Sequence, residues 1–188
     1  MNGGGIICFT GWPQSGKSTL ARAAVRRMRR EGLPALLLDG DAVREALVPP
    51  PGYAQEEREA FYATLANLAG LLARQGLWVA VAATLHLRRF RERMRAQAPG
   101  RRYLEVLVDA TAEQCEARDA KGLYARFRRG EAPTLPGMGA PYERPERPDV
   151  VASGGRDARA TAEIAGRALR LAKAALCARR HLGAGDVR

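Results

Sequence analysis

The sequence has few cysteines, few aromatic side chains and no long apolar run. Three cysteines in 188 residues are too few and too widely spaced for a disulfide framework or a zinc site. Cys8, Cys115 and Cys177 each stand among apolar neighbours, so we expect all three to be buried as small hydrophobic side chains. No stretch could span a bilayer, and no charged start leads into an apolar signal segment. These absences predict a reduced, cytoplasmic protein with no membrane partner.

Acidic residues are also scarce relative to basic ones. The chain has 31 Lys and Arg against 20 Asp and Glu, which gives a formal net charge of +11. Such an excess attracts phosphate groups, and it would also suit nucleic acid. Aromatic residues are only 6% of the chain, and no basic and aromatic stretch or recognition module for bases is visible. We therefore predict no nucleic-acid partner, and a nucleic-acid-binding NTPase is a minor alternative.

Short apolar runs alternate with amphipathic stretches along the chain. Strands are predicted over residues 6–10, 35–38, 77–83, 103–108 and 149–152. Helices are predicted over residues 17–31, 43–47, 55–75, 87–98, 112–119 and 161–181. This alternation predicts a single α/β domain over residues 1–188, with a five-stranded parallel sheet covered by helices on both faces.

A glycine-rich loop joins the first predicted strand to the first predicted helix. Residues 11–18, GWPQSGKS, fit the P-loop pattern G-x-x-x-x-G-K-[ST]. Such a loop points backbone N–H groups at a phosphate, and the helix N-terminus adds partial positive charge there. Lys17 can reach the β- and γ-phosphates of ATP, while the Ser18 hydroxyl can bind Mg²⁺. The predicted nucleotide-binding residues of this loop are Gly11, Ser15, Gly16, Lys17, Ser18 and Thr19.

Phosphoryl transfer also needs an acidic residue that handles the metal, at the end of a neighbouring strand. Asp39 and Asp109 both follow apolar runs at such a place. Asp39 is favoured because Asp41 lies two residues on, which puts two carboxylates near the metal and the attacking hydroxyl. Asp41 could also cap the short helix that follows. We predict Lys17, Asp39 and Asp41 as catalytic residues, and Ser18 and Asp39 as metal ligands.

Basic residues gather beside a segment rich in proline and glycine. They are Arg118, Lys121, Arg126, Arg128 and Arg129. In a phosphotransferase such a cluster can close over the nucleotide and stabilise the transition state, and the alternative is a solvated helix face. We predict a lid over residues 118–148.

Four segments resemble adenylylsulfate kinases. Residues 39–44, DGDAVR, resemble the D-G-D-N-V-R element of that family, and residues 52–58 resemble its G-F-S-x-E-D-R segment. Residues 118–124, RDAKGLY, match R-D-P-K-G-L-Y with one change, and residues 141–148 match P-Y-E-x-P-E-N-P apart from its Asn. The resemblance covers residues 6–152, in the family's order and spacing.

This resemblance implies a P-loop kinase fold and an activity. The activity is the ATP- and Mg²⁺-dependent phosphorylation of the 3′-hydroxyl of adenosine 5′-phosphosulfate, usually by a homodimer. Asp39 and Asp41 would serve the metal and the acceptor hydroxyl. Arg118 would lie against the adenine of ATP. The positions that would contact the acceptor are Arg44, Arg58, Phe61, Lys121 and Leu135.

The departures from the family lie in the acceptor half. Phe61 stands where the family has an Asn, and Leu135 replaces a Phe that stacks on the acceptor adenine. Leu85 replaces a serine. An apolar side chain cannot supply the hydrogen bonds of an Asn, and unpaired polar edges on a ligand are costly. A related kinase acting on another nucleotide-like or antibiotic-like hydroxyl is therefore the main alternative, beside a nucleotide-binding protein without turnover.

Overall fold

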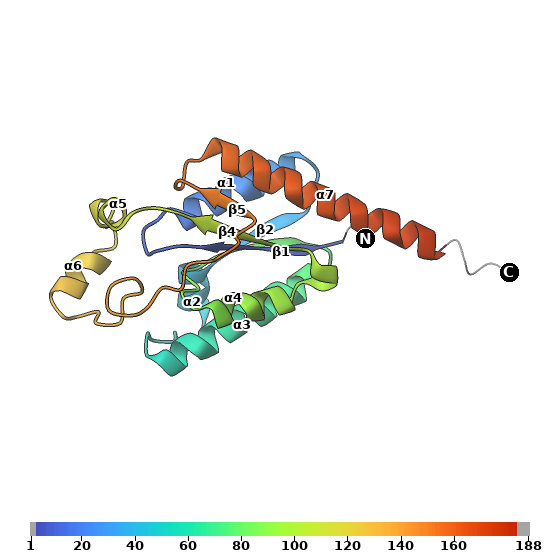
Figure 1. Cartoon of the computed structure of the whole chain (residues 1–188). Helices are drawn as coiled ribbons and strands as arrows, with labels where there is room; N and C mark the ends of the chain where they lie inside the picture. The colour runs from blue at the N-terminus through green and yellow to red at the C-terminus, as the bar shows by residue number, and fades with distance from the viewer. Residues whose placement is uncertain (1–2, 184–188) are drawn as a thin grey trace.

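The computed structural model describes residues 3–183, and a parallel sheet forms its centre (Figure 1). The strands are β1 (Gly5–Thr10), β2 (Ala35–Asp39), β3 (Trp78–Ala82), β4 (Tyr103–Val108) and β5 (Val150–Ala152). They lie in the order β2-β3-β1-β4-β5, and every neighbouring pair is parallel. The predicted five-stranded parallel sheet is confirmed.

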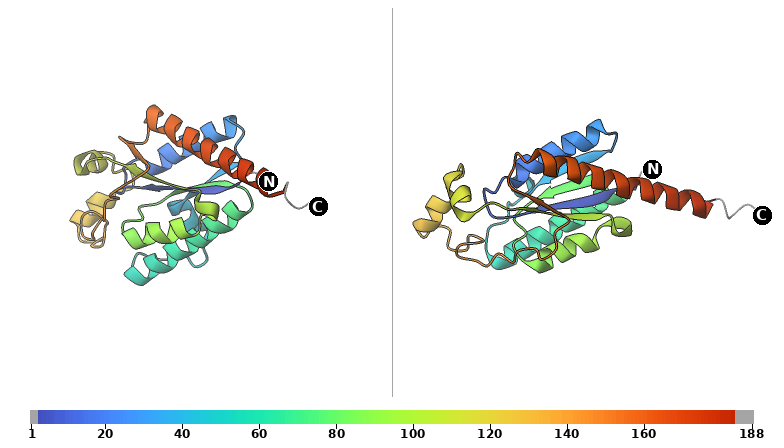
Figure 2. Two further views of the ribbon diagram at one scale, coloured as in Figure 1. Left: turned by 45° about the vertical axis from the view of Figure 1, so that its right-hand side comes forward. Right: turned by 45° about the horizontal axis from the view of Figure 1, so that its top comes forward.

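Helices cover both faces of this sheet. They are α1 (Lys17–Arg30), α2 (Gly40–Ala46), α3 (Gln55–Arg74), α4 (Arg88–Ala96), α5 (Ala112–Ala117), α6 (Leu123–Arg128) and α7 (Ala158–Gly183), with a short 3₁₀ turn at Pro99–Arg101. The helices α1 and α7 lie on one face, and α3 and α4 lie on the other (Figures 1 and 2). The α5 and α6 helices stand apart, beyond one end of the sheet.

The central strand supplies both faces of the core. Along β1, Ile7 and Phe9 pack in the cluster under α1 and α7, whereas Ile6 and Cys8 pack in the cluster under α3 and α4. This alternation follows from the two-residue period of a strand. Because both faces are covered, the strand is a nearly continuous apolar run that ends in Thr10.

Two details differ from the sequence-based expectations. The basic segment after residue 120 contains a helix, α6, that the sequence pattern did not predict. The Asp119 carboxylate accepts hydrogen bonds from the backbone N–H groups of Leu123, Tyr124 and Ala125, and so begins this helix. Cys177 is exposed on α7, so the prediction that all three cysteines are buried is wrong for it, while Cys8 and Cys115 are buried. Within residues 3–183, no helix combines the length and the apolar character needed to cross a membrane.

Candidate functional site

A cavity of about 670 Å³ lies beyond the carboxyl ends of the central strands, where open parallel sheets bind ligands. It brings together most of the residues predicted from the sequence. They are Gly16, Lys17, Ser18, Thr19, Asp39, Asp41, Arg44, Arg58, Phe61, Arg118, Lys121 and Leu135. Gly11 and Ser15 also belong to the loop but do not line the cavity, because both are buried.

The loop between β1 and α1 has the backbone that the P-loop pattern predicts. Gly16 caps α1 with φ near 102°, in the left-handed region that favours glycine. A Cβ at this residue would lie 2.6 Å from the backbone nitrogen of Gly155. A larger residue would therefore both strain the loop and push away the segment after β5. The Ser15 hydroxyl is fully buried and has no hydrogen-bond partner among the described residues.

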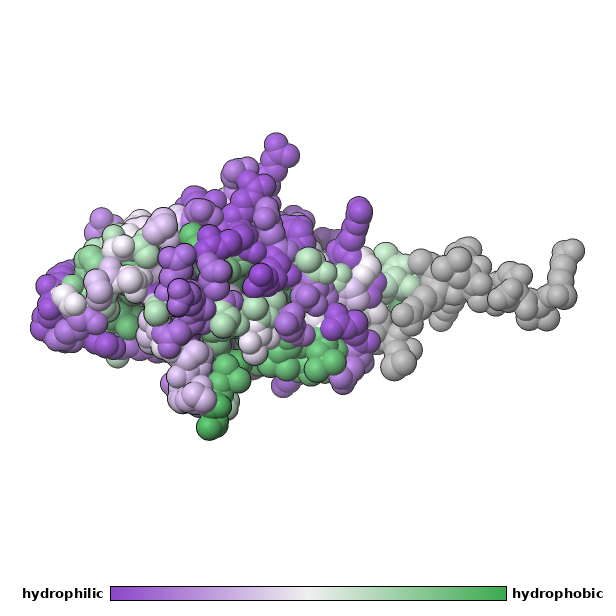
Figure 3. All heavy atoms as spheres, turned by 90° about the horizontal axis from the view of Figure 1, so that it is seen from below, coloured by the Kyte–Doolittle hydropathy of each residue, from purple (hydrophilic) through white to green (hydrophobic). Residues whose placement is uncertain are grey.

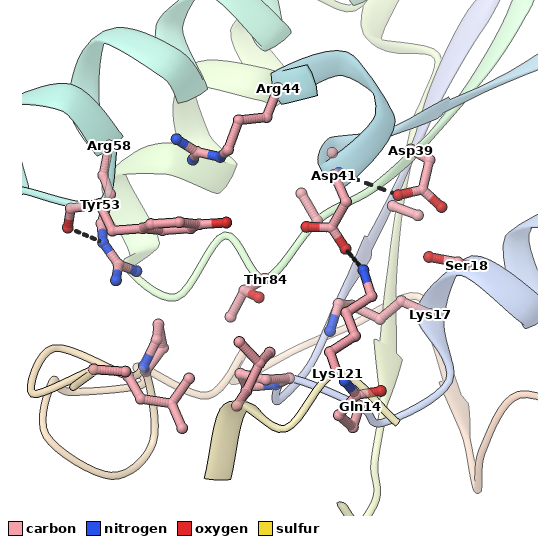
Figure 4. A pocket seen from close by; sticks show the side chains of 18 of the residues that line it. Gln14, Lys17, Ser18, Asp39, Asp41, Arg44, Tyr53, Arg58, Thr84 and Lys121 are labelled. Atoms are coloured by element: carbon pink, nitrogen blue, oxygen red, sulfur yellow. Dashed lines mark hydrogen bonds and ion pairs between the residues drawn. The ribbon is translucent and has the colours of Figure 1, made fainter. Parts of the chain in front are cut away.

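Lys17 lines the cavity, and Figure 4 shows its side chain beside Asp41 and Lys121. Its Nζ donates hydrogen bonds to the carbonyl oxygens of Gly11, at 3.0 Å, and Trp12, at 2.6 Å. Burial lowers the pKa of Lys17 to about 8, although the carboxylates of Asp41 and Asp39 act in the opposite direction. A phosphate group in the cavity would stabilise the charged form of this lysine.

Asp39 rather than Asp41 caps the α2 helix. The Asp39 Oδ1 accepts a hydrogen bond of 3.2 Å from the backbone N–H of Asp41, and α2 begins one residue after Asp39. The expectation that Asp41 could be the cap is therefore wrong, since Asp41 lies in the first turn. The Asp41 carboxylate instead forms an ion pair with Lys121, across the cavity from α2.

The other acid considered from the sequence is not available to the cavity. Both carboxylate oxygens of Asp109 accept hydrogen bonds from Arg144, at 2.6 and 2.8 Å. These bonds hold the pKa of Asp109 below its usual range. Asp109 does not line the cavity, which supports the choice of Asp39.

The donor chemistry near the P-loop suits Mg²⁺. Figure 4 shows the Ser18 hydroxyl and the Asp39 carboxylate on the same side of the cavity. Among the described residues, no group of three or more His, Cys, Asp or Glu side chains could hold a metal by itself. Mg²⁺ is usually held by one or two protein oxygens together with substrate phosphates and water. A hydroxyl and a carboxylate beside a phosphate-binding loop fit that pattern.

The opposite wall of the cavity holds two buried arginines. Arg44 and Arg58 are 8% and 9% exposed, and neither forms an ion pair with any described carboxylate. Burial lowers the pKa of Arg58, and the nearby positive charge of Arg44 lowers it further. Two uncompensated cations on one wall make this half of the cavity a receptor for an anionic group.

The R-D-x-K-G-L-Y segment, residues 118–124, connects the α5–α6 region to the P-loop. The Arg118 guanidinium donates to the carbonyl oxygen of Ser15 at 3.2 Å, and the Tyr124 hydroxyl donates to that of Pro13 at 3.0 Å. Gly122 has φ near 62°, which a side chain would strain. Arg118 also borders a second cavity of about 500 Å³, between the start of α1 and the glycines that follow β5.

The P-Y-E segment, residues 141–143, ties the returning chain to the sheet. The Tyr142 hydroxyl lies 3.1 Å from the Thr10 hydroxyl at the end of β1. The backbone N–H of Glu143 donates to the His86 carbonyl at 2.8 Å, and its carboxylate accepts from the backbone N–H of Arg88 at 2.5 Å. Tyr142 and Glu143 thus hold the returning chain in place, and neither lines the cavity.

Several cavity residues were not predicted as functional, and three of them carry polar groups that face the site. Gln14, Tyr53 and Thr134 line the cavity, and Thr134 accepts two hydrogen bonds from Arg58 through its carbonyl and hydroxyl oxygens, at 3.0 and 3.1 Å. Gln14 has φ near 62°, which is unusual for a residue with a side chain. Tyr53 occupies the aromatic position of the G-F-S-like segment, and this is the signal that could have identified it.

Comparison with known proteins agrees with this geometry. The family described as adenylylsulphate kinase matches residues 3–153. The adenylyl-sulfate kinase of Paraburkholderia xenovorans is 40% identical over 148 residues, covering 79% of this chain and 82% of that protein. The one from Chloroflexus aurantiacus is 42% identical over 145 residues, covering 77% of each.

A solved structure extends the similarity to the fold. The Mycobacterium tuberculosis APS kinase, solved in complex with AMPPNP and APS, superposes with a TM-score of 0.77 at 33% identity. The match covers 91% of this chain and 96% of that chain. With its P-loop, its two acids and its two buried arginines in one cavity, the chain belongs to the adenylylsulphate kinase family.

Proposed function

We propose that this chain is an ATP-dependent kinase that phosphorylates the 3′-hydroxyl of adenosine 5′-phosphosulfate to give 3′-phosphoadenylyl sulfate. The observation that carries this proposal is the arrangement of the cavity. A phosphate-binding loop forms one wall, two arginines without carboxylate partners form the opposite wall, and two aspartates lie between them. A site built this way binds two anionic molecules and holds a hydroxyl between them.

The donor half of the cavity fits ATP. The P-loop backbone and Lys17 would hold the β- and γ-phosphates, and the charge of Lys17 would compensate the transferred group. Arg118 borders the second cavity, whose size and position beyond Gly16 suit the purine. The guanidinium would stack on the base there. Bound Mg²⁺, held by Ser18 and Asp39, would neutralise charge on the phosphates.

Asp41 is the group best placed to receive the proton of the acceptor hydroxyl. It lines the cavity beside Lys17, and its carboxylate now pairs with Lys121. Lys121 comes from the segment between α5 and α6, so a ligand that draws this lysine away would free the carboxylate. The carboxylate would then orient the hydroxyl in line with the γ-phosphoryl group.

The acceptor half fits a molecule with a strongly anionic end. Arg44 and Arg58 would hold the phosphosulfate group. Leu135 is 6% exposed and packs with Cys115 and Tyr124, yet it also forms part of the cavity wall, where it would cover the acceptor base. Such recognition depends on charge and shape. A related kinase for another anionic nucleotide-like alcohol is the alternative that an acceptor screen distinguishes.

The direct test is release of ADP from ATP and Mg²⁺ in the presence of different acceptors. We expect adenosine 5′-phosphosulfate to support turnover far better than adenosine monophosphate, a nucleoside diphosphate or an aminoglycoside. Lys17→Ala should nearly abolish turnover. Arg26→Ala is the matched control, because Arg26 is exposed on the same α1 helix. Faster turnover of another acceptor would replace the proposed substrate, and no turnover of any would indicate a binding protein.

We also propose that residues 118–148 act as a lid on the cavity. This segment contributes Lys121 and Leu135 to the cavity wall, and Tyr124 connects it to the P-loop. Trp12 of the P-loop packs against its small hydrophobic cluster, so tryptophan fluorescence should report movement of the lid. A fluorescence change on adding ATP that is absent in Trp12→Phe would support this role, and its absence in the wild type would contradict it.

We further propose that the enzyme is a homodimer that pairs through α3. Residues 60–73 contain no charged side chain, and Leu71 is 51% exposed on the outer face of α3. The side of the molecule formed by α3 and α4 shows a hydrophobic area among hydrophilic ones (Figure 3). In an antiparallel pair, the acidic start of one α3 would face the basic end of the other. Light scattering should give twice the chain mass, and Leu71→Arg should give a monomer. A monomeric wild type would contradict this.

A further inference from the structure

Arg44 is held in the cavity by aromatic rings. Its Cζ lies 4.0 Å from the ring centroid of Phe61 and 4.6 Å from that of Tyr53. The guanidinium is thus in contact with two rings at once. Figure 4 shows the Tyr53 ring between the side chains of Arg44 and Arg58, and the Arg58 Cζ lies 5.4 Å from the same ring.

Hydrogen bonds constrain only one nitrogen of Arg44. Its Nη1 donates to the carbonyl oxygens of Pro51, at 2.8 Å, and Gly52, at 2.5 Å. In the described part of the chain, no acceptor bonds to its Nε or Nη2, and no carboxylate pairs with it. The rings therefore do much of what a carboxylate does for other buried arginines: they keep the cation in place. Unlike a carboxylate, they leave its positive charge available to a ligand.

Phe61 is the ring best placed for this task. It is 3% exposed and packs in the core under α3 and α4, so its plane is fixed by its neighbours. Tyr53 is 57% exposed and lies at the cavity mouth. The buried ring is a rigid platform, while the exposed ring closes the stack from the open side. A cation held against an aromatic face is stabilised most when it is removed from water, as Arg44 is.

We propose that Phe61 is a positioning residue of the acceptor site, which acts through Arg44. Its ring orders the guanidinium so that the free nitrogens face the anionic group of the acceptor. This inference rests on the proposed kinase function. It assigns to Phe61 a role that does not require a hydrogen bond to the acceptor, which a phenyl ring could not make.

The role predicts a particular kinetic signature. Removing the ring while keeping an apolar side chain, in Phe61→Leu, should raise the KM for adenosine 5′-phosphosulfate by about 3- to 30-fold. The KM for ATP should stay within about twofold, since the P-loop half is untouched. Phe61→Tyr keeps the ring face and should restore the KM to near the wild-type value. Tyr53→Leu, at an exposed position that tolerates change, should raise the same KM by a smaller factor.

Two controls distinguish the proposed positioning of Arg44 from a role of Phe61 in core packing alone. Phe90→Leu removes another ring from the same core, on α4, at 3% exposure and away from the cavity. It should lower the melting temperature about as much as Phe61→Leu without raising the KM for the acceptor. In an Arg44→Lys background, Phe61→Leu should change that KM less than twofold, because the planar cation that it orders is already absent.

The deciding experiment measures both KM values for the wild type, Phe61→Leu, Tyr53→Leu, Phe90→Leu and the Arg44→Lys pair. An acceptor KM that rises in Phe61→Leu and Tyr53→Leu, and does not rise in Phe90→Leu, supports the inference. An unchanged acceptor KM in Phe61→Leu overturns the inference, and so does an equal effect of Phe61→Leu in the Arg44→Lys background. If the wild type itself does not use adenosine 5′-phosphosulfate, the proposed function fails instead, and this result is recognisable before any variant is made.

Discussion

Raising the pH should remove the positive charge of Lys17 before it removes any other charge in the donor half of the cavity. Burial lowers the pKa of this lysine from its ordinary 10.5 to about 8. With that pKa, about 90% of the free enzyme carries the charge at pH 7 and about 10% at pH 9. The kcat/KM for ATP reports the protonation state of the free enzyme, so it should fall about tenfold between pH 7 and pH 9. Lys121 does not titrate in this range, since its pKa is raised above its ordinary value.

The assay is the pH dependence of kcat/KM for ATP at an acceptor concentration well below its KM, so that the free enzyme is the form observed, with enzyme stability checked at each pH. Lys17→Arg is the control, because a guanidinium stays charged throughout the range. Its activity should be lower but should show no decline centred near pH 8. The same lysine affects stability: between pH 8 and 10.5 the unfolded chain binds more protons there, so stability relative to Lys17→Met should rise with pH. A wild-type profile that is flat to pH 9.5, or an equal decline in Lys17→Arg, would refute this reasoning.

Three further predictions concern the acids and the attachment of the proposed lid. Asp39→Asn should raise the Mg²⁺ concentration needed for half-maximal turnover, whereas Asp109→Asn should leave it within about twofold, because that carboxylate is paired outside the cavity; equal effects of the two would contradict the assignment. Asp41→Asn should lower kcat by about 10²- to 10⁴-fold with little change in the KM for ATP, as steady-state kinetics would show, and a change confined to that KM would argue against a role in the chemical step. Tyr124→Phe leaves the buried Pro13 carbonyl without its hydrogen bond and should lower the free energy of unfolding by about 1–3 kcal/mol in urea titrations; unchanged stability would show that this bond contributes nothing.

Local patterns in the sequence were enough to predict the fold and the donor half of the site. The apolar runs that became β1, β2 and β4 belong to a sheet covered by helices, and such runs are recognisable because most of their consecutive residues are apolar. The P-loop was recognisable for a similar reason, since its glycines have backbone angles that other residues avoid. In both cases a few consecutive residues contain the whole signal that identifies the structure.

Contacts between distant residues could not be predicted in this way. The choice between Asp39 and Asp109 depends on Arg144, which lies 35 residues beyond Asp109 and is brought to it by the returning chain. The start of α6 depends on one carboxylate, that of Asp119, which lies outside the helix and accepts three backbone hydrogen bonds from its first turn. A motif shows which residue types recur together, but only the fold shows which of them face the cavity.

The acceptor half illustrates the same limit. From the sequence, Phe61 is a departure that removes a hydrogen bond from the acceptor. In the structure, the ring contacts Arg44, which lies on a different helix and is itself an acceptor-site residue. The pairing depends on how α2 packs on α3, and no spacing within either helix indicates it.

The most direct test of the proposed activity is transfer of label from [γ-³²P]ATP in a single turnover, with adenosine 5′-phosphosulfate and with its 3′-deoxy analogue as acceptors. The site predicts that the first is labelled on its 3′-oxygen. It predicts that the second, which retains the anionic group that Arg44 and Arg58 would hold, binds competitively and receives no label. Labelling of the 3′-deoxy analogue, or no labelling of adenosine 5′-phosphosulfate while another alcohol is labelled, would contradict the proposed phosphorylation of the 3′-hydroxyl.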